Sequence, residues 1–256
     1  MLLEVVRVHQ SFGGVRALDD VSCKVYEGQT LALIGPNGAG KTTLLNVVAG
    51  TLRPSGGEVL MRGRSILRLS APERVRLGLV RTFQQALLFD GMTALENVMV
   101  GAHLRGRRGL ADAALRTPAS RREEEDLYLE GMRYLNLVGL GSKAEDPAAS
   151  LPFGQQRLLA VARALAAEPS LLLLDEPGAG LNRLEKDSLA DLIRRIREMG
   201  ITVVLVEHDM GLVMRLADWV VVLDQGRRLA QGTPVEVRRN PAVIEAYLGT
   251  GDGAHA

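Results

Sequence analysis

A glycine-rich stretch, GPNGAGKTT at residues 35–43, combines residue types that bind a chain of phosphates. It fits G-x-x-x-x-G-K-[ST], in which glycines let the backbone curl and point its N–H groups at phosphate oxygens. The Lys41 ammonium would reach the β- and γ-phosphates, and the Thr42 hydroxyl would bind Mg²⁺. The residues expected to hold a nucleoside triphosphate are Gly35, Pro36, Asn37, Gly38, Ala39, Gly40, Lys41, Thr42 and Thr43.

Two carboxylates, Asp175 and Glu176, follow the apolar run LLLL. They would lie at the carboxyl end of a buried strand, where open α/β sheets bind ligands. Asp175 would then face the Mg²⁺ shell, while Glu176 would orient or deprotonate a water molecule opposite the leaving group. His208 follows another apolar run, ITVVLV, and its placement predicts a contact with the γ-phosphate. Taken singly, each could instead be an ordinary solvated side chain.

Bulk composition excludes several classes of protein. The 256 residues suffice for one large domain or two small ones with a well-buried core. A net charge of +1 argues against a dedicated nucleic-acid binder. The one cysteine, Cys23, excludes an internal disulfide and, by itself, a thiolate metal site. No apolar run approaches the roughly 18 residues of a membrane span, and the amino-terminal residues do not resemble a secretion signal. We therefore expect a soluble, intracellular protein without direct membrane insertion.

The pattern of apolar residues places these motifs on an α/β scaffold. Residues 4–9 and 21–26 alternate apolar and polar side chains, which predicts an antiparallel β layer that leads into the buried strand TLALI. The segment KTTLLNVVAG has helical spacing and stops at Gly50, a good helix end. Short apolar strands that alternate with helices predict parallel βαβ units in a three-layer α/β core.

The middle of the chain has a different pattern. From Ser70 to about Ala149 it is mainly helical and polar, with a mixed loop at 103–126. We assign residues 1–84 and 156–256 to the α/β core with its antiparallel β layer, and 85–155 to an inserted helical subdomain. Near the end, DQGRRLAQG predicts a closing hairpin, and helices are expected after Pro234 and Pro241.

Five motif segments follow one another along the chain in the order GPNGAGKT, RTFQQ, LPFGQQR, LLLLDEP and EHD. In this order, over nearly the whole chain, they resemble the ATP-binding-cassette (ABC) ATPases. Guanine-nucleotide enzymes normally carry N-K-x-D, which this sequence lacks. A P-loop kinase would carry lid arginines in place of LPFGQQR. The resemblance implies ATP and Mg²⁺ as cofactors.

The resemblance also implies roles for further residues. Gln84 would contact Mg²⁺ and the attacking water, with Gln85 as the other candidate, and Phe12 would stack on adenine. Gly154 and Gln155, at the start of a predicted helix, would cap the ATP held by a second subunit. Pro152 stands where the family usually has serine, and it removes a hydroxyl that would bond the γ-phosphate. Loss of one such hydrogen bond, about 1 kcal/mol, predicts slower or weaker closure rather than inactivity.

Local features narrow the resemblance. RTFQ, EHDMGLVM and NPAVIEAYLG are similar to the ATPase subunits of bacterial branched-chain amino-acid importers. This implies two membrane permease subunits, a second ATPase subunit as homo- or heterodimer, and, indirectly, a periplasmic solute-binding protein. It also implies a cytoplasmic location on the inner face of the membrane, and no nucleic-acid partner.

Two alternatives remain open from the sequence. One is a transporter of urea, short amides or another small solute, including an exporter. The other is a soluble ABC ATPase that acts in DNA repair or on ribosomes, although those proteins usually carry tandem cassettes or long coiled-coil insertions.

Overall fold

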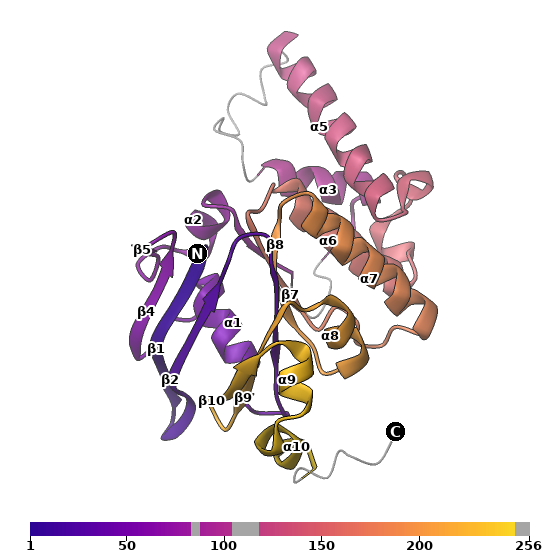
Figure 1. Ribbon diagram of the computed structural model, residues 1–256. Helices are drawn as coiled ribbons and strands as arrows, with labels where there is room; N and C mark the ends of the chain where they lie inside the picture. The colour runs from indigo at the N-terminus through magenta and orange to yellow at the C-terminus, as the bar shows by residue number, and fades with distance from the viewer. Residues whose placement is uncertain (83–87, 104–117, 249–256) are drawn as a thin grey trace. The chain divides into compact units, whose positions relative to one another are not determined.

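The computed structural model describes residues 1–82, 88–103 and 118–248 (Figure 1). The chain divides into two compact units, one formed by Met1–Arg74 with Leu173–Ala256 and the other by Val75–Leu172. Within the described ranges, no helix has both the length and the apolar character that a membrane crossing needs.

The first unit contains a four-stranded antiparallel sheet of strand order β2-β1-β4-β5. Its strands are β1 (Leu3–Phe12), β2 (Val15–Val25), β4 (Gly56–Met61) and β5 (Arg64–Ser65). The predicted antiparallel pairing is observed, with Val5 opposite Cys23 and Leu3 opposite Val25. Leu3 and Val5 alternate as buried residues of β1, and after a register shift between Val5 and Val8 the buried positions continue at Val8 and Gln10.

The second sheet of this unit carries the chemical motifs. Its strands are β3 (Thr30–Ile34), β7 (Leu171–Asp175), β8 (Thr202–Val206), β9 (Trp219–Asp224) and β10 (Arg227–Gly232). They follow the order β10-β9-β3-β8-β7, with β3 parallel to β8 and β9, and β10 antiparallel to β9. Every residue of β3, β7 and β8 is buried, which explains why these strands read as continuous apolar runs.

Five helices complete the first unit: α1 (Lys41–Ala49), α7 (Arg183–Glu198), α8 (Met210–Leu216), α9 (Pro234–Arg238) and α10 (Pro241–Leu248). Figure 1 shows α1 between the two sheets, with α7 and α8 beyond the second sheet. The helix starts expected after Pro234 and Pro241 are observed. Asn182 caps α7 in a capping box with Glu185, in which its amide oxygen accepts from Glu185 N–H over 3.0 Å.

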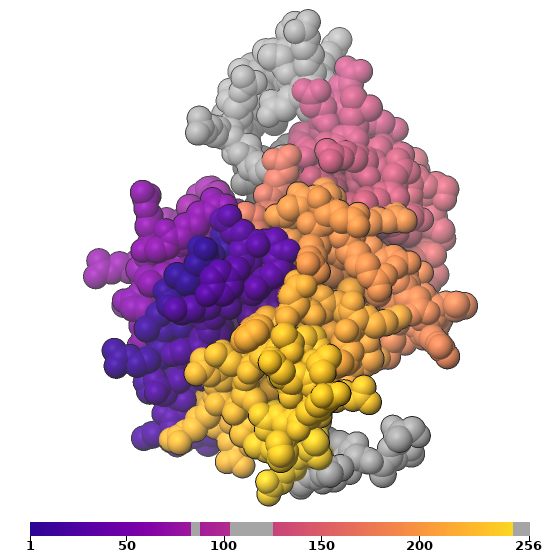
Figure 2. Space-filling view, viewed as in Figure 1, coloured from indigo at the N-terminus to yellow at the C-terminus, as the bar shows by residue number. Residues whose placement is uncertain are grey.

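The carboxyl-terminal hairpin lies against the amino-terminal strands. Figure 2 shows the late residues (yellow) beside the early ones (indigo) on one face. Arg228 of β10 donates to the Ser22 carbonyl of β2 over 2.6 Å. The strand β10, near the carboxyl terminus, therefore supports β2 of the antiparallel sheet near the amino terminus.

The second unit is mainly helical. It contains β6 (Leu79–Arg81), α3 (Ala94–His103), α5 (Pro118–Leu137), 3-10 turns at Gly141–Lys143 and Ala148–Ser150, and α6 (Phe153–Ala166). The helix α2 (Ala71–Arg76) and the strand β7 run across the boundary between the units. The loop predicted at 103–126 is wrong in its last part, because α5 already begins at Pro118. Proline is favoured at the first position of a helix, which explains this start.

Buried Arg74 fixes the far end of α1. Arg74 is only 2% exposed, and its guanidinium donates to the carbonyls of Val47 and Val48, each over 2.7 Å. The same group donates to the Leu69 carbonyl over 3.1 Å. A cation at the carboxyl end of a helix satisfies carbonyls that have no partner within the helix. Burial lowers the pKa of Arg74, but these acceptors stabilise its charge.

We expect Arg74→Ala to lower the free energy of unfolding by about 3 kcal/mol, because buried carbonyls lose charged donors. Arg76→Ala, on the same helix but exposed, is the matched control and should change stability little. Urea unfolding followed by circular dichroism measures both. Equal stability of the two variants would show that the Arg74 contacts contribute nothing.

Candidate functional site

The phosphate-binding loop joins β3 to α1, as predicted. Its last glycine, Gly40, is the residue before α1 and has a φ of 98°, in the left-handed region. No side chain caps this helix start, and no acidic residue lies in its first turn. The N–H groups at the amino end of α1 therefore remain available for an anion, and the helix dipole favours one there.

The loop is surrounded so closely by backbone that two of its glycines have no room for a side chain. A Cβ on Gly35 would lie 2.0 Å from the Leu223 carbonyl oxygen, and one on Gly40 would lie 2.5 Å from that of Ala17. The turn between β9 and β10 adds a direct link, since Gly226 N–H donates to the Ala39 carbonyl over 3.2 Å. Main chain from β2, β9 and this turn thus fixes the curve of the loop.

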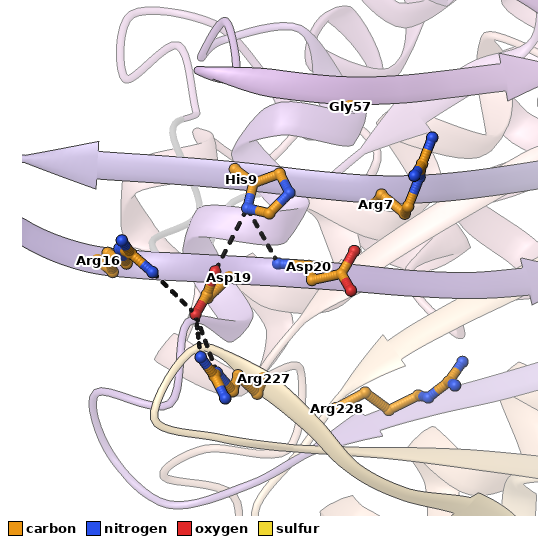
Figure 3. Close-up of a pocket in the computed structure, with 8 residues that line it drawn as sticks. All are labelled: Arg7, His9, Arg16, Asp19, Asp20, Gly57, Arg227 and Arg228. Carbon is orange, nitrogen blue, oxygen red and sulfur yellow. Dashed lines mark hydrogen bonds and ion pairs between the residues drawn. The ribbon is translucent and has the colours of Figure 1, made fainter.

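An ion-pair network holds that turn in place (Figure 3). Arg227 donates to Asp19 through Nε over 2.9 Å and Nη2 over 2.5 Å, and Arg16 approaches the same oxygen at 3.4 Å. The hydrogen bonds from Arg227 hold the pKa of Asp19 below its ordinary value. Asp19 N–H also donates to the Gly226 carbonyl over 2.7 Å, so the network leads directly to the phosphate-binding loop.

Lys41, Asp175 and Glu176 share one electrostatic environment. Lys41 is buried and donates to the carbonyls of Gly35 and Pro36 over 2.7 and 2.9 Å. Burial lowers the pKa of Lys41, while the charges of Glu176 and Asp175 raise it. Asp175 is buried at the end of β7, and Glu176 follows with a φ of 47°. Such a backbone conformation is strained for a residue with a side chain and is typical of functional positions.

His208 lies two residues beyond β8, the strand whose Val206 carbonyl accepts from Glu176 N–H over 2.9 Å. The His208 side chain is 60% exposed. Asp209 caps α8 by accepting from Leu212 N–H over 3.1 Å and pairs with Lys186 over 2.6 Å. The hydrogen bond from Lys186 lowers the pKa of Asp209. Glu207 lies between β8 and His208, and its carboxylate is buried. None of the motifs singled out this residue, although an acid directly after the apolar run ITVVLV is visible in the sequence.

The remaining predicted site residues are Phe12, Gln84 with the alternative Gln85, and the pair Gly154 and Gln155. Phe12 ends β1 and is 48% exposed, so its ring is accessible for stacking. Gln84 and the alternative Gln85 lie outside the described residues. Across the part of the chain that the structure describes, no group of three or more His, Cys, Asp and Glu side chains is placed to hold a metal ion.

Gly154 and Gln155 lie in the first turn of α6, in the second unit. Pro152 precedes this helix and gives it no side-chain cap. Gln155 Oε1 is buried and has no hydrogen-bond partner among the described residues, whereas Phe153 is exposed beneath the Arg157 guanidinium at 4.7 Å. The start of α6 is therefore a second uncapped helix end.

Comparison with known proteins decides the family. The ABC transporter family profile matches residues 18–179. The chain is 45% identical over 249 residues to the high-affinity branched-chain amino acid transport ATP-binding protein BraF of Pseudomonas aeruginosa, covering 97% of this chain and 98% of BraF. This chain belongs to the ABC transporter family. A profile for branched-chain amino acid ATP-binding cassette transporters also matches residues 227–253 of this ABC chain.

Solved structures confirm the ABC fold. The ADP-bound conformation of MJ1267, an ATP-binding cassette of an ABC transporter, matches with a TM-score of 0.84 and 30% identity, covering 97% of this chain and 98% of MJ1267. The dimeric structure of the cassette MJ0796 matches with a TM-score of 0.78 and 26% identity, covering 91% and 99%. The predicted α/β core with an antiparallel β layer and a helical part is confirmed.

Alanine substitutions at two glycines of the ABC phosphate-binding loop distinguish backbone strain from steric contact with neighbouring main chain. Both Gly38 and Gly40 have positive φ, but only Gly40 meets backbone within 3 Å. We expect Gly38→Ala to cost about 1 kcal/mol of stability and Gly40→Ala about 3 kcal/mol. Denaturant unfolding of both variants tests this, and equal losses would mean that the Ala17 carbonyl does not constrain the loop.

Proposed function

We propose that this chain is the ATP-binding and ATP-hydrolysing subunit of a membrane ABC importer for branched-chain amino acids. The uncapped amino end of α1, enclosed by backbone and next to buried Lys41, is the observation that carries the nucleotide site. The similarity to BraF over nearly the full length of both chains supports the transport role and the class of solute.

ATP fits the phosphate-binding loop for electrostatic reasons. Two carbonyls hold the Lys41 ammonium at the base of the loop, and burial makes its charge costly there. Phosphate oxygens would exchange these neutral acceptors for charged ones and so stabilise the cation. Main-chain N–H groups of residues 35–43 would bind the same oxygens, and Phe12 would stack on the adenine.

Mg²⁺ also suits the side chains present. Thr42 is exposed in the first turn of α1, and the carboxylate of Asp175 is buried at the end of β7. Hydroxyl and carboxylate oxygens, together with phosphate, are the ligands that Mg²⁺ prefers. Gln84 is a third proposed ligand. When bound, Mg²⁺ would offset negative charge on the phosphates.

Glu176 and His208 are the proposed hydrolytic pair. Glu176 would orient and deprotonate the water that attacks the γ-phosphate, from a left-handed backbone position directly after β7. His208, with an exposed ring, would donate to a γ-phosphate oxygen. Lys41 would neutralise the charge that develops on the same oxygens.

Hydrolysis is proposed to need two ATPase subunits. Each chain has an uncapped helix start in both units, at α1 and at α6. In a head-to-tail dimer, Gly154 and Gln155 of one subunit would close over the ATP held by the other. The dimeric structure of the related cassette MJ0796 supports this arrangement. Pro152 leaves only main-chain donors at that point.

The remaining partners follow from the proposed transport role. Two permease subunits would hold the dimer at the inner face of the membrane, with Gln84 at the contact that couples closure to solute movement. A periplasmic binding protein would deliver the solute to those permeases, so the solute itself would not meet this chain.

Glu176→Gln should abolish turnover, with a fall in rate of at least about 100-fold, because the amide cannot take a proton. The variant should still bind ATP and accumulate as an ATP-dependent dimer. Phosphate release and light scattering after size exclusion measure the two effects. Glu198→Gln, an exposed acid on α7, is the control. Turnover at the wild-type rate in Glu176→Gln would contradict the assignment of the base.

The solute class is tested by isolation of the complex. An affinity-tagged chain should bring two polytopic permeases out of solubilised membranes. In proteoliposomes with the binding protein, ATP should drive uptake of labelled leucine but not of labelled urea. Urea uptake would assign the alternative solute class, and a complex without permeases would contradict the transport role.

A further inference from the structure

A buried carboxylate lies beside the hydrolytic residues without a part in the mechanism above. Among the described residues, Asp175 and Glu207 are the two buried acidic side chains, and Glu207 is fully buried at 0% exposure. Burial raises the pKa of Glu207, partly offset by the N–H group of Gly178. A carboxylate in such a place is retained only where its oxygens are well bonded.

The two oxygens of Glu207 bind two different loops. Oε1 accepts from the N–H of Gly178, over 2.7 Å. Oε2 accepts from the N–H of His208 over 3.3 Å and lies 4.0 Å from His208 Nδ1. One side chain therefore joins the loop after Glu176, residues 177–182, to the segment that carries His208.

These bonds continue the pairing of β7 and β8 beyond the ends of the strands. Glu176 N–H donates to the Val206 carbonyl over 2.9 Å, a main-chain bond between the two strand ends. Two residues later, the Gly178 N–H meets the Glu207 side chain instead of a carbonyl. The backbone around Glu176 is thus bonded at two points. The Val206 carbonyl accepts from the N–H of Glu176, and the Glu207 carboxylate accepts from the N–H of Gly178.

Gly178 is matched to this carboxylate. A Cβ at Gly178 would lie 2.8 Å from Glu207 Oε1 and 3.2 Å from Leu212 Cδ2. Gly178 does not have a positive φ, so alanine there would be strained by contact alone. The close approach of loop and carboxylate therefore depends on the missing side chain.

We propose that Glu207 is a positioning residue that holds the 177–182 loop and His208 in one arrangement. The hydrolytic base, the γ-phosphate contact and the 177–182 loop then keep one geometry, on which closure of the proposed dimer over ATP depends. This inference rests on the proposed function, because it assigns Glu207 a part in ATP hydrolysis between two subunits.

The experiment measures ATP hydrolysis by the full-length chain with Glu207→Asp, Gly178→Ala and the double variant. A shorter acid at position 207 and a methyl group at position 178 both disrupt the hydrogen bond between Gly178 N–H and Glu207 Oε1. Each single variant should therefore lose about tenfold in kcat. The KM for ATP should stay within about twofold, since the phosphate-binding loop is untouched. The double variant should be no slower than the slower single variant, because both changes act through one contact.

Gly56→Ala is the matched control, since its added Cβ would meet only ordinary contacts, the nearest at 3.7 Å from His9. In a Glu176→Gln background, Gly178→Ala should also reduce the ATP-dependent dimer, which a purely structural role would not predict in a folded, ATP-binding protein. Circular dichroism and ATP affinity verify that state.

Each outcome bears on one proposal. Wild-type protein that neither hydrolyses ATP nor dimerises would overturn the proposed function. Active wild type together with unchanged kcat in folded Glu207→Asp and Gly178→Ala would overturn the positioning role alone. Losses that multiply in the double variant would overturn it as well, because the two residues would then act separately.

Discussion

The amino end of α1 must face an anion without a side-chain cap, and much of the first unit serves to keep it so. Carbonyls of Ala17 and Leu223 lie where Cβ atoms of Gly40 and Gly35 would be. The Gly226 N–H bonds the loop from a third direction. With no side-chain cap at the start of α1 and main chain enclosing the loop, the N–H groups of this helix end stay directed at the place a phosphate chain would occupy.

Side chains outside the recognised motifs hold the motif segments together. Asp19 fixes the β9–β10 turn that bonds the phosphate-binding loop, and Arg74 fixes the other end of α1. Glu207 ties the loop after Glu176 to His208. Each of the three is a charged group with at least one partner far away in the sequence. The phosphate loop and hydrolytic residues thus depend on contacts between the two sheets and their connecting loops.

The two units differ in what they offer to a nucleotide. The first contains the phosphate-binding loop, the two acids at the end of β7 and His208, whereas the second presents the start of α6 with an exposed phenylalanine. Under the proposed dimer, one subunit would supply the base of each site and its partner the covering helix end. Residue Pro152 then matters less for its missing hydroxyl than for the free main-chain donors that follow it.

The amino-acid sequence by itself determined the strands, the phosphate-binding loop and the family. Short continuous apolar runs such as LLLLD and TLALI are typical of strands buried on both faces, and the spacing of glycine, lysine and threonine admits few alternatives. Such local patterns do not reveal partners. That Glu207 would reach Gly178 and that Arg74 would cap α1 was decided by the tertiary structure. The physical reason is that a buried charge is stabilised by donors and acceptors from elements distant in the chain, whose positions only folding brings together.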